Sequence, residues 1–143
     1  MAAETDDFLR QLLTSVKTIA VVGLSAKEER ASNRVANFLG EQGYHVIGVN
    51  PGLAGKSING AEVFASLADI PEPVDMVDVF RNSAAAGGVV GEALALTPRP
   101  RVIWMQLGVI DEVAAARARA CGVTVVMDRC PKIEIARLGP SKR

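Results

Sequence analysis

Five short apolar runs constrain the fold of this chain more than any other feature of its sequence. They are rich in β-branched residues, have the length of strands, and lie at 18–22, 44–49, 74–80, 102–105 and 123–127. Segments with helical spacing lie between most of them. Strands that alternate with helices pair in parallel through right-handed crossovers. The sequence therefore predicts an α/β fold, a doubly wound, five-stranded Rossmann-type sheet in the order 3-2-1-4-5.

The segments between these strands are assigned from their spacing and their turn residues. Residues 1–16 carry an apolar stripe that predicts an amphipathic helix packed on the domain, and residues 1–143 are expected to form a single domain. The stretch 53–61 is interpreted as a loop, followed by a short helix near 62–68. Ser83 is the expected N-cap of a later helix.

Charge and cysteine content exclude several classes of protein. The 16 Lys and Arg residues balance 16 Asp and Glu residues, which argues against attraction to nucleic acid or to an anionic membrane. No leader and no run of membrane-spanning length is visible, so we expect a cytoplasmic protein. The two cysteines form no disulfide framework, and the absence of a His/Cys cluster argues against a metal site.

The functional signal is the passage from strand to helix at 17–34. Gly23 ends the first strand, and Ser25, Lys27 and Arg34 follow before or within the start of a helix. This order directs backbone N–H groups and the positive end of a helix dipole toward an anion, typically a phosphate. In such sheets the ligand lies beyond the carboxyl ends of the strands. The sequence therefore predicts a nucleotide-type site there.

Two familiar nucleotide fingerprints are missing. A dinucleotide site would have GxGxxG after the first strand and an acidic residue at the end of the second, whereas this chain has Ser25 after Gly23 and ends its second strand at Asn50 and Pro51. No GxxxxGK[ST] motif occurs. An NAD(P)-dependent oxidoreductase, or another nucleotide-binding domain, is therefore the alternative rather than the first choice.

A set of motifs resembles the small CoA-binding proteins of the YccU-like family. They are VVGLSAK after the first strand, then VNP, DVFR, WMQLG and MDRC, and the resemblance runs over 17–138. It implies a fold similar to the CoA-binding domain of the succinyl-CoA synthetase α subunit. It also implies a domain that binds coenzyme A at its strand ends.

The resemblance further implies which residues bind CoA. The first loop would lie against the phosphates, the Asn-Pro turn would line the nucleotide, and the ends of the third and fourth strands would complete the site. These residues are Gly23, Leu24, Ser25, Ala26, Lys27, Asn50, Pro51, Lys56, Phe80, Arg81, Gln106 and Gly108.

The charges of this region agree with CoA, which carries a 3′-phosphate and a pyrophosphate. Cations that can reach them are Lys27, Arg30, Arg34, Lys56 and Arg81. Glu28 and Glu29 stand beside Lys27 and Arg30, so a solvated loop of mixed charge is the competing interpretation for any one of them.

The one histidine, the one tryptophan and the two cysteines are each assigned a role. His45 lies at the start of the second strand, opposite the expected cleft, and is assigned a structural or solvent role. Trp104 and Cys121 are expected in the core. Cys130 follows the fifth strand near the site, where burial is the main interpretation and a mixed disulfide with the CoA thiol is the alternative.

No pairing of a nucleophile with a base is recognisable, so no catalytic residue is assigned. Acyl-CoA synthetases of similar fold use a histidine in a second domain that this chain lacks. We therefore expect a binding or regulatory module for CoA or an acyl-CoA, with the protein partner unspecified. The other interpretation is an interaction domain that has lost its ligand.

Overall fold

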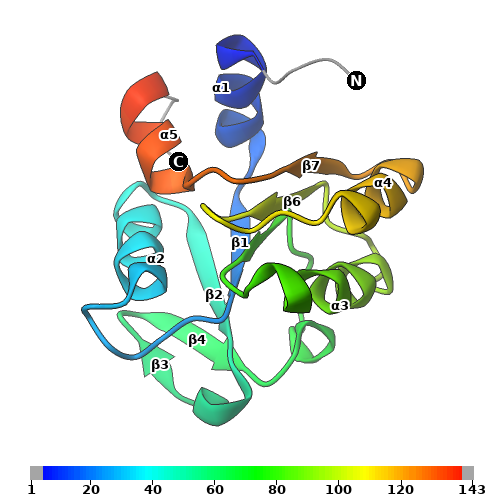
Figure 1. Cartoon of the computed structure of the whole chain (residues 1–143). Helices are drawn as coiled ribbons and strands as arrows, with labels where there is room; N and C mark the ends of the chain where they lie inside the picture. The colour runs from blue at the N-terminus through cyan, green and yellow to red at the C-terminus, as the bar shows by residue number, and fades with distance from the viewer. Residues whose placement is uncertain (1–4, 140–143) are drawn as a thin grey trace.

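The predicted Rossmann-type α/β fold is confirmed. The computed structural model describes residues 5–139, and within them seven strands form one sheet in the order β3-β4-β2-β1-β5-β6-β7 (Figure 1). All neighbouring pairs are parallel except β3 with β4. The strands are β1 (Thr18–Val22), β2 (His45–Val49), β3 (Ser57–Ile58), β4 (Ala61–Phe64), β5 (Met76–Val79), β6 (Val102–Met105) and β7 (Thr124–Val126).

The predicted number and order of strands are wrong on one side of the sheet. The run at 74–80 forms β5, which pairs with β1 and not outside β2. The place beside β2 belongs to β4, in the stretch interpreted as a short helix. The six parallel strands therefore lie in the order β4-β2-β1-β5-β6-β7. If only these six are numbered along the chain, the order is 3-2-1-4-5-6.

A two-residue turn explains the missed hairpin. Asn59 and Gly60 have φ angles of 51° and 86° and join β3 to β4. An Asn-Gly pair is the strongest local signal for such a turn, because both positions need a positive φ. Along β4, Ala61 and Val63 are buried and Glu62 is exposed, which is the period of two that a strand requires.

Helices cover both faces of the sheet (Figure 1). Side chains of α1, α2 and α5 pack into one apolar cluster, and those of α3 and α4 pack into another on the opposite face. The helices are α1 (Asp6–Ser15), α2 (Ala31–Glu41), α3 (Ser83–Leu94), α4 (Glu112–Ala120) and α5 (Pro131–Leu138), with short 3₁₀ turns at η1 (Pro51–Leu53) and η2 (Leu67–Asp69).

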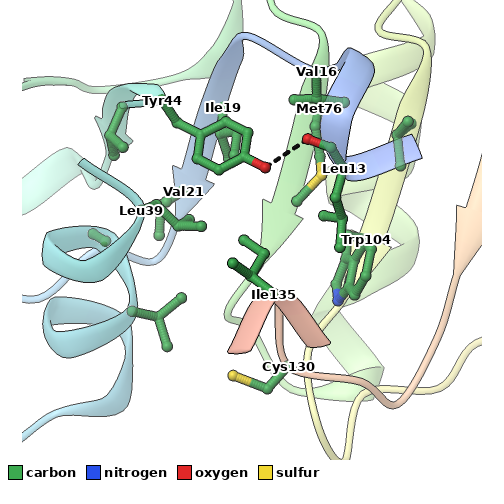
Figure 2. Packing of buried hydrophobic residues seen from close by; sticks show 14 of the residues in the cluster. Leu13, Val16, Ile19, Val21, Leu39, Tyr44, Met76, Trp104, Cys130 and Ile135 are labelled. Carbon is green, nitrogen blue, oxygen red and sulfur yellow. Dashed lines mark hydrogen bonds between the residues drawn. The ribbon is translucent and has the colours of Figure 1, made fainter. Parts of the chain in front are cut away.

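The predicted amphipathic helix forms as α1 and packs against α5, while residues 1–4 of the predicted range 1–16 lie outside the described residues. Leu9 and Leu13 are fully buried, and the Tyr44 hydroxyl donates to the Leu13 carbonyl at 2.5 Å (Figure 2). Arg10 Nε donates to the Leu138 carbonyl at 2.9 Å, and Arg137 pairs with Asp6 at 3.0 Å. These contacts tie the C-terminal end of α5 to α1.

The predicted positions of Trp104 and His45 agree with the structure, and those of the α3 cap and Cys121 do not. Trp104 is fully buried, and His45 lies at the amino end of β2 with its Nε2 3.1 Å from Glu72 Oε1. The cap of α3 is Asn82 rather than Ser83, because the Asn82 side chain accepts from the Ala85 N–H. Cys121 is exposed rather than in the core, since α4 ends at Ala120 and the helical period stops there.

Within residues 5–139, none of the helices combines the length and the apolar character needed to cross a bilayer.

Candidate functional site at the carboxyl ends of the strands

The order in which successive strands are added to the sheet reverses at β1. From β1 it moves outward to β2 and β4, and it then crosses back to place β5 on the other side of β1. In open α/β sheets a crevice forms beyond the carboxyl ends of the strands at such a point. Gly23 follows β1, Asn50 follows β2, Phe80 follows β5 and Gln106 follows β6. The predicted site residues therefore converge at one edge.

A network of hydrogen bonds fixes the loop between β1 and α2. The Ser25 N–H donates to Ser32 Oγ at 3.0 Å, and Asn33 Nδ2 donates to the Ser25 carbonyl at 2.9 Å. Ser32 and Asn33 are buried. Arg34 donates from Nη1 to the carbonyls of Glu28 and Glu29. The loop is thus held in place by its own polar groups.

The start of α2 is open to an anion. Its N-cap is Arg30, which makes no side-chain hydrogen bond to the first turn of the helix. The first N–H groups of a helix lack partners inside it and carry the positive end of its dipole. The Asn33 and Arg34 N–H groups donate to the Arg30 carbonyl. Because no side chain caps this end within residues 5–139, the N–H groups of Ala31 and Ser32 can serve an anion such as a phosphate.

Gly23 is required where β1 meets β5. Its φ is 95°, and a Cβ at this position would lie 2.5 Å from the Phe80 carbonyl oxygen. The Gly23 N–H donates to the Val49 carbonyl at 2.8 Å. A larger residue would push the ends of β1 and β5 apart, so the glycine sets the close approach of the site's two sides.

Asn50 ties the end of β2 to the first loop. Its Nδ2 donates to the Leu24 carbonyl at 2.8 Å, and its Oδ1 accepts from the Gly52 N–H at 2.9 Å. The second bond caps the 3₁₀ turn that Pro51 opens. Both ends of the Asn50 amide are therefore used in positioning the loop.

A first hollow, which we term the polar cleft, lies over the ends of β1, β2 and β5 beside α3. Its volume is about 340 Å³, and the lining residues include Gly23, Asn50, Pro51, Phe80, Arg81 and Glu92. Arg81 is exposed, and no hydrogen bond or ion pair within residues 5–139 engages its guanidinium. The cleft therefore offers a cation that no described side chain engages.

A second hollow, the apolar groove, runs between α2 and α5. Its volume is about 780 Å³, and its lining is mainly apolar, with Arg34, Lys132 and Arg137 as the cations among the lining residues. Other lining residues include Val35, Phe80, Gln106, Cys130 and Ile133. Phe80 lines both hollows, so both adjoin the end of β5.

Seven of the predicted ligand residues line one hollow or both. Gly23, Asn50, Pro51, Phe80 and Arg81 line the polar cleft, and Arg34, Phe80 and Gln106 line the apolar groove.

The other predicted ligand residues lie outside both hollows. Leu24 is fully buried against Gly48, and its carbonyl already accepts from Asn50 Nδ2. Ser25 organises the first loop, while Ala26, Lys27 and Lys56 are exposed. The Gly108 N–H donates to Asp128 Oδ1 at 2.8 Å and is therefore already used.

Two parts of the site were not predicted from the sequence. Ser32 and Asn33 hold the first loop, and their signal is the preference of Ser and Asn for helix starts. Helix α5 supplies Lys132 and Ile133, and its signal is Pro131 at the first helical position.

Two buried polar side chains, one on β5 and one just after β6, have oxygen atoms without hydrogen-bond partners among the described residues. Asp78 is fully buried, and neither of its carboxylate oxygens has a hydrogen-bond partner among the described residues. Burial raises the pKa of this carboxyl well above its usual range, which favours the neutral acid. Gln106 is also buried, and its Oε1 lacks a partner in the same part of the chain.

The sheet order and the crevice at its switch point define the chain as an α/β protein of the Rossmann type. A family model described as a CoA binding domain matches residues 17–136. The chain belongs to this family of CoA-binding domains.

Similar proteins are known from bacteria and archaea. The uncharacterized protein YneT of Bacillus subtilis is 38% identical over 125 residues, which cover 87% of this chain and 90% of YneT. A solved Thermus thermophilus structure, cell-free ID.343, is 40% identical with a TM-score of 0.89 and covers 94% of this chain and 99% of that chain. A hypothetical protein from Pyrococcus horikoshii OT3 is 34% identical with a TM-score of 0.88, and the match covers 95% of this chain and 93% of that chain.

Proposed function

We propose that this chain binds coenzyme A or an acyl-CoA across the polar cleft and the apolar groove. The observation that carries the proposal is that Phe80 lines both of these hollows. CoA is itself a molecule of two parts, a phosphorylated nucleotide and a long pantetheine arm. The polar cleft suits the first part and the apolar groove suits the second.

The residues of the polar cleft and the first loop fit a ligand with several phosphates. The uncapped start of α2 offers backbone N–H groups, and Arg81 offers a guanidinium that nothing else in residues 5–139 engages. Arg binds phosphate oxygens through paired, charge-assisted hydrogen bonds. The preformed loop lowers the entropy that binding costs, because its conformation is already fixed.

The residues of the apolar groove fit the pantetheine arm. This arm is flexible, carries amide groups and ends in a thiol. Gln106 Oε1 lacks a partner and can accept from an amide N–H, while Val35 and Ile133 offer apolar contact. A buried acceptor without a partner costs free energy, so a ligand that supplies the donor is stabilised.

The end of β2 argues against NAD as the ligand. An NAD site uses a carboxylate there to hold the ribose hydroxyls. Asn50 stands at this position, and both ends of its amide already bond to Leu24 and Gly52.

We further propose a binding or regulatory role without turnover. The amides and cations of the polar cleft and the first loop can hold a phosphorylated ligand. The residues that line the cleft include one carboxylate, Glu92, but no Ser, Thr, Cys or His that it could activate as a nucleophile.

Calorimetry of the full chain with CoA, dephospho-CoA, NAD and NADP tests the proposal. CoA is expected to bind and NAD is not. Loss of the 3′-phosphate should weaken binding by about tenfold for each 1.4 kcal/mol of lost contact. Equal binding of NAD and CoA, or no binding of either, would overturn the assignment.

A further inference from the structure

Cys130 occupies a position that the binding function does not explain. It is the N-cap of α5, is 6% exposed and lines the apolar groove. Figure 2 shows its sulfur directed away from Trp104 and toward α2, which forms the other wall of the groove. The thiol is therefore buried from the protein surface but borders a space large enough for a ligand.

A second observation links this thiol to a ligand. Gln106, in the lining of the same groove, has a buried Oε1 without a partner among residues 5–139. An unpartnered amide oxygen and a thiol, on two residues that line one groove, match a ligand that carries both an N–H donor and sulfur. The pantetheine arm of CoA has this chemistry.

We propose that Cys130 captures the thiol end of CoA as a mixed disulfide. This inference rests on the proposed function, because the nucleotide held in the polar cleft would send the arm past Phe80 into the groove. The protein would then be a redox-dependent carrier of CoA, which retains the cofactor covalently when CoA disulfide accumulates.

The exchange is balanced with CoA disulfide as the oxidant. The Cys130 thiolate attacks one sulfur of the disulfide, a new bond forms between Sγ and that sulfur, and the original S–S bond breaks. One CoA leaves as a thiolate and takes a proton from water. Cys130 is oxidised and the departing CoA is reduced, so a small thiol in excess reverses the reaction.

The chain contains a natural control for this proposal. Cys121 is exposed at the end of α4, whereas Cys130 is buried. A reaction governed by simple exposure would modify Cys121 first. A reaction directed by binding would modify Cys130, because the bound arm raises the local concentration of the disulfide at that thiol.

The test incubates the full chain with CoA disulfide and, separately, with glutathione disulfide at the same concentration. Intact mass and peptide mapping follow the native protein, Cys121→Ser and Cys130→Ser. We expect one CoA adduct on Cys130, kept in Cys121→Ser and absent from Cys130→Ser. It should form more than about tenfold faster than the glutathione adduct and slow when reduced CoA competes.

Calorimetry with reduced CoA on the same samples separates this inference from the proposed function. CoA binding without an adduct on Cys130, or preferential labelling of Cys121, overturns the capture and leaves the binding function intact. Absence of CoA binding overturns both. If Cys130→Ser fails to fold, Cys130→Ala and the peptide map of the native protein decide the site of the adduct.

Discussion

The polar cleft and the apolar groove are built by different means. The loop beside the polar cleft is fixed by hydrogen bonds between neighbours, from Ser25 to Ser32 and Asn33, with Asn50 as the main distant tie. The apolar groove exists because α2 and α5, which are far apart in the sequence, pack on the same face of the sheet. The first loop is thus fixed mainly by local contacts, whereas the apolar groove depends on tertiary packing.

The largest expected effect breaks the junction of the two hollows. Gly23→Ala should lower the free energy of unfolding by about 3 kcal/mol and abolish CoA binding, because the new Cβ meets the Phe80 carbonyl and the φ is positive. Urea unfolding and calorimetry measure the two effects.

Gly55→Ala is the matched control for this change. Gly55 also has a positive φ, of 85°, but a Cβ there has no atom within 4 Å. It should cost about 1 kcal/mol and leave CoA binding unchanged. Equal costs at the two glycines would show that the close approach to Phe80 contributes nothing.

The next effect concerns the polar cleft alone. Arg81→Ala should weaken CoA binding by about 2 kcal/mol, or roughly thirtyfold, through loss of a charge-assisted contact. Stability should change little because the guanidinium is exposed. Adenosine 3′,5′-bisphosphate, which lacks the pantetheine arm, should lose affinity to the same degree.

Lys17→Ala controls for the loss of a positive charge, since Lys17 is exposed and precedes β1 at the opposite end of the sheet. Similar losses of affinity in both variants would mean that general charge, and not the cleft, attracts the ligand.

The third effect concerns the buried acid on the sheet face that α2 and α5 cover. Asp78 lies two residues before Phe80 on the same strand face, and burial raises its pKa. Between the unfolded pKa of about 3.9 and the raised folded pKa, the folded state keeps a proton that the unfolded chain releases. The free energy of unfolding should therefore fall as pH rises, by up to about 1.4 kcal/mol per pH unit.

Asp78→Asn should remove this fall and become more stable than the native protein as pH rises through that window. Urea unfolding over a series of pH values measures it, with the exposed Asp69→Asn as the control for loss of a surface carboxylate. Parallel pH curves for the native protein and Asp78→Asn would contradict the assignment.

The smallest effect concerns the apolar groove alone. Ile133→Asp should weaken CoA binding by about 1 kcal/mol, because it removes apolar contact with the arm. Binding of adenosine 3′,5′-bisphosphate should be unchanged. The control is Val113→Asp, which places the same charge on an exposed apolar position of α4. Equal weakening of both ligands by Ile133→Asp would place the nucleotide, not the arm, in the groove.

Local patterns in the sequence account for most of the sheet. The five predicted runs correspond to β1, β2, β5, β6 and β7, because a strand buried on both faces is a continuous apolar stretch. Strands β3 and β4 were missed since both are short and partly exposed, and the Asn59–Gly60 turn between them was the available signal.

For the site, the sequence by itself determined that polar and small residues follow each strand and meet at one edge, because parallel strands bring their carboxyl ends together. Only the tertiary structure decided how they divide, with Arg81 in the polar cleft, Gln106 in the apolar groove and Leu24 in the core. It also decided that β5, rather than β6, lies beside β1. The physical reason is that both outcomes depend on which helix faces and strand edges pack together, and contacts between residues far apart in the chain leave no periodic trace in the sequence.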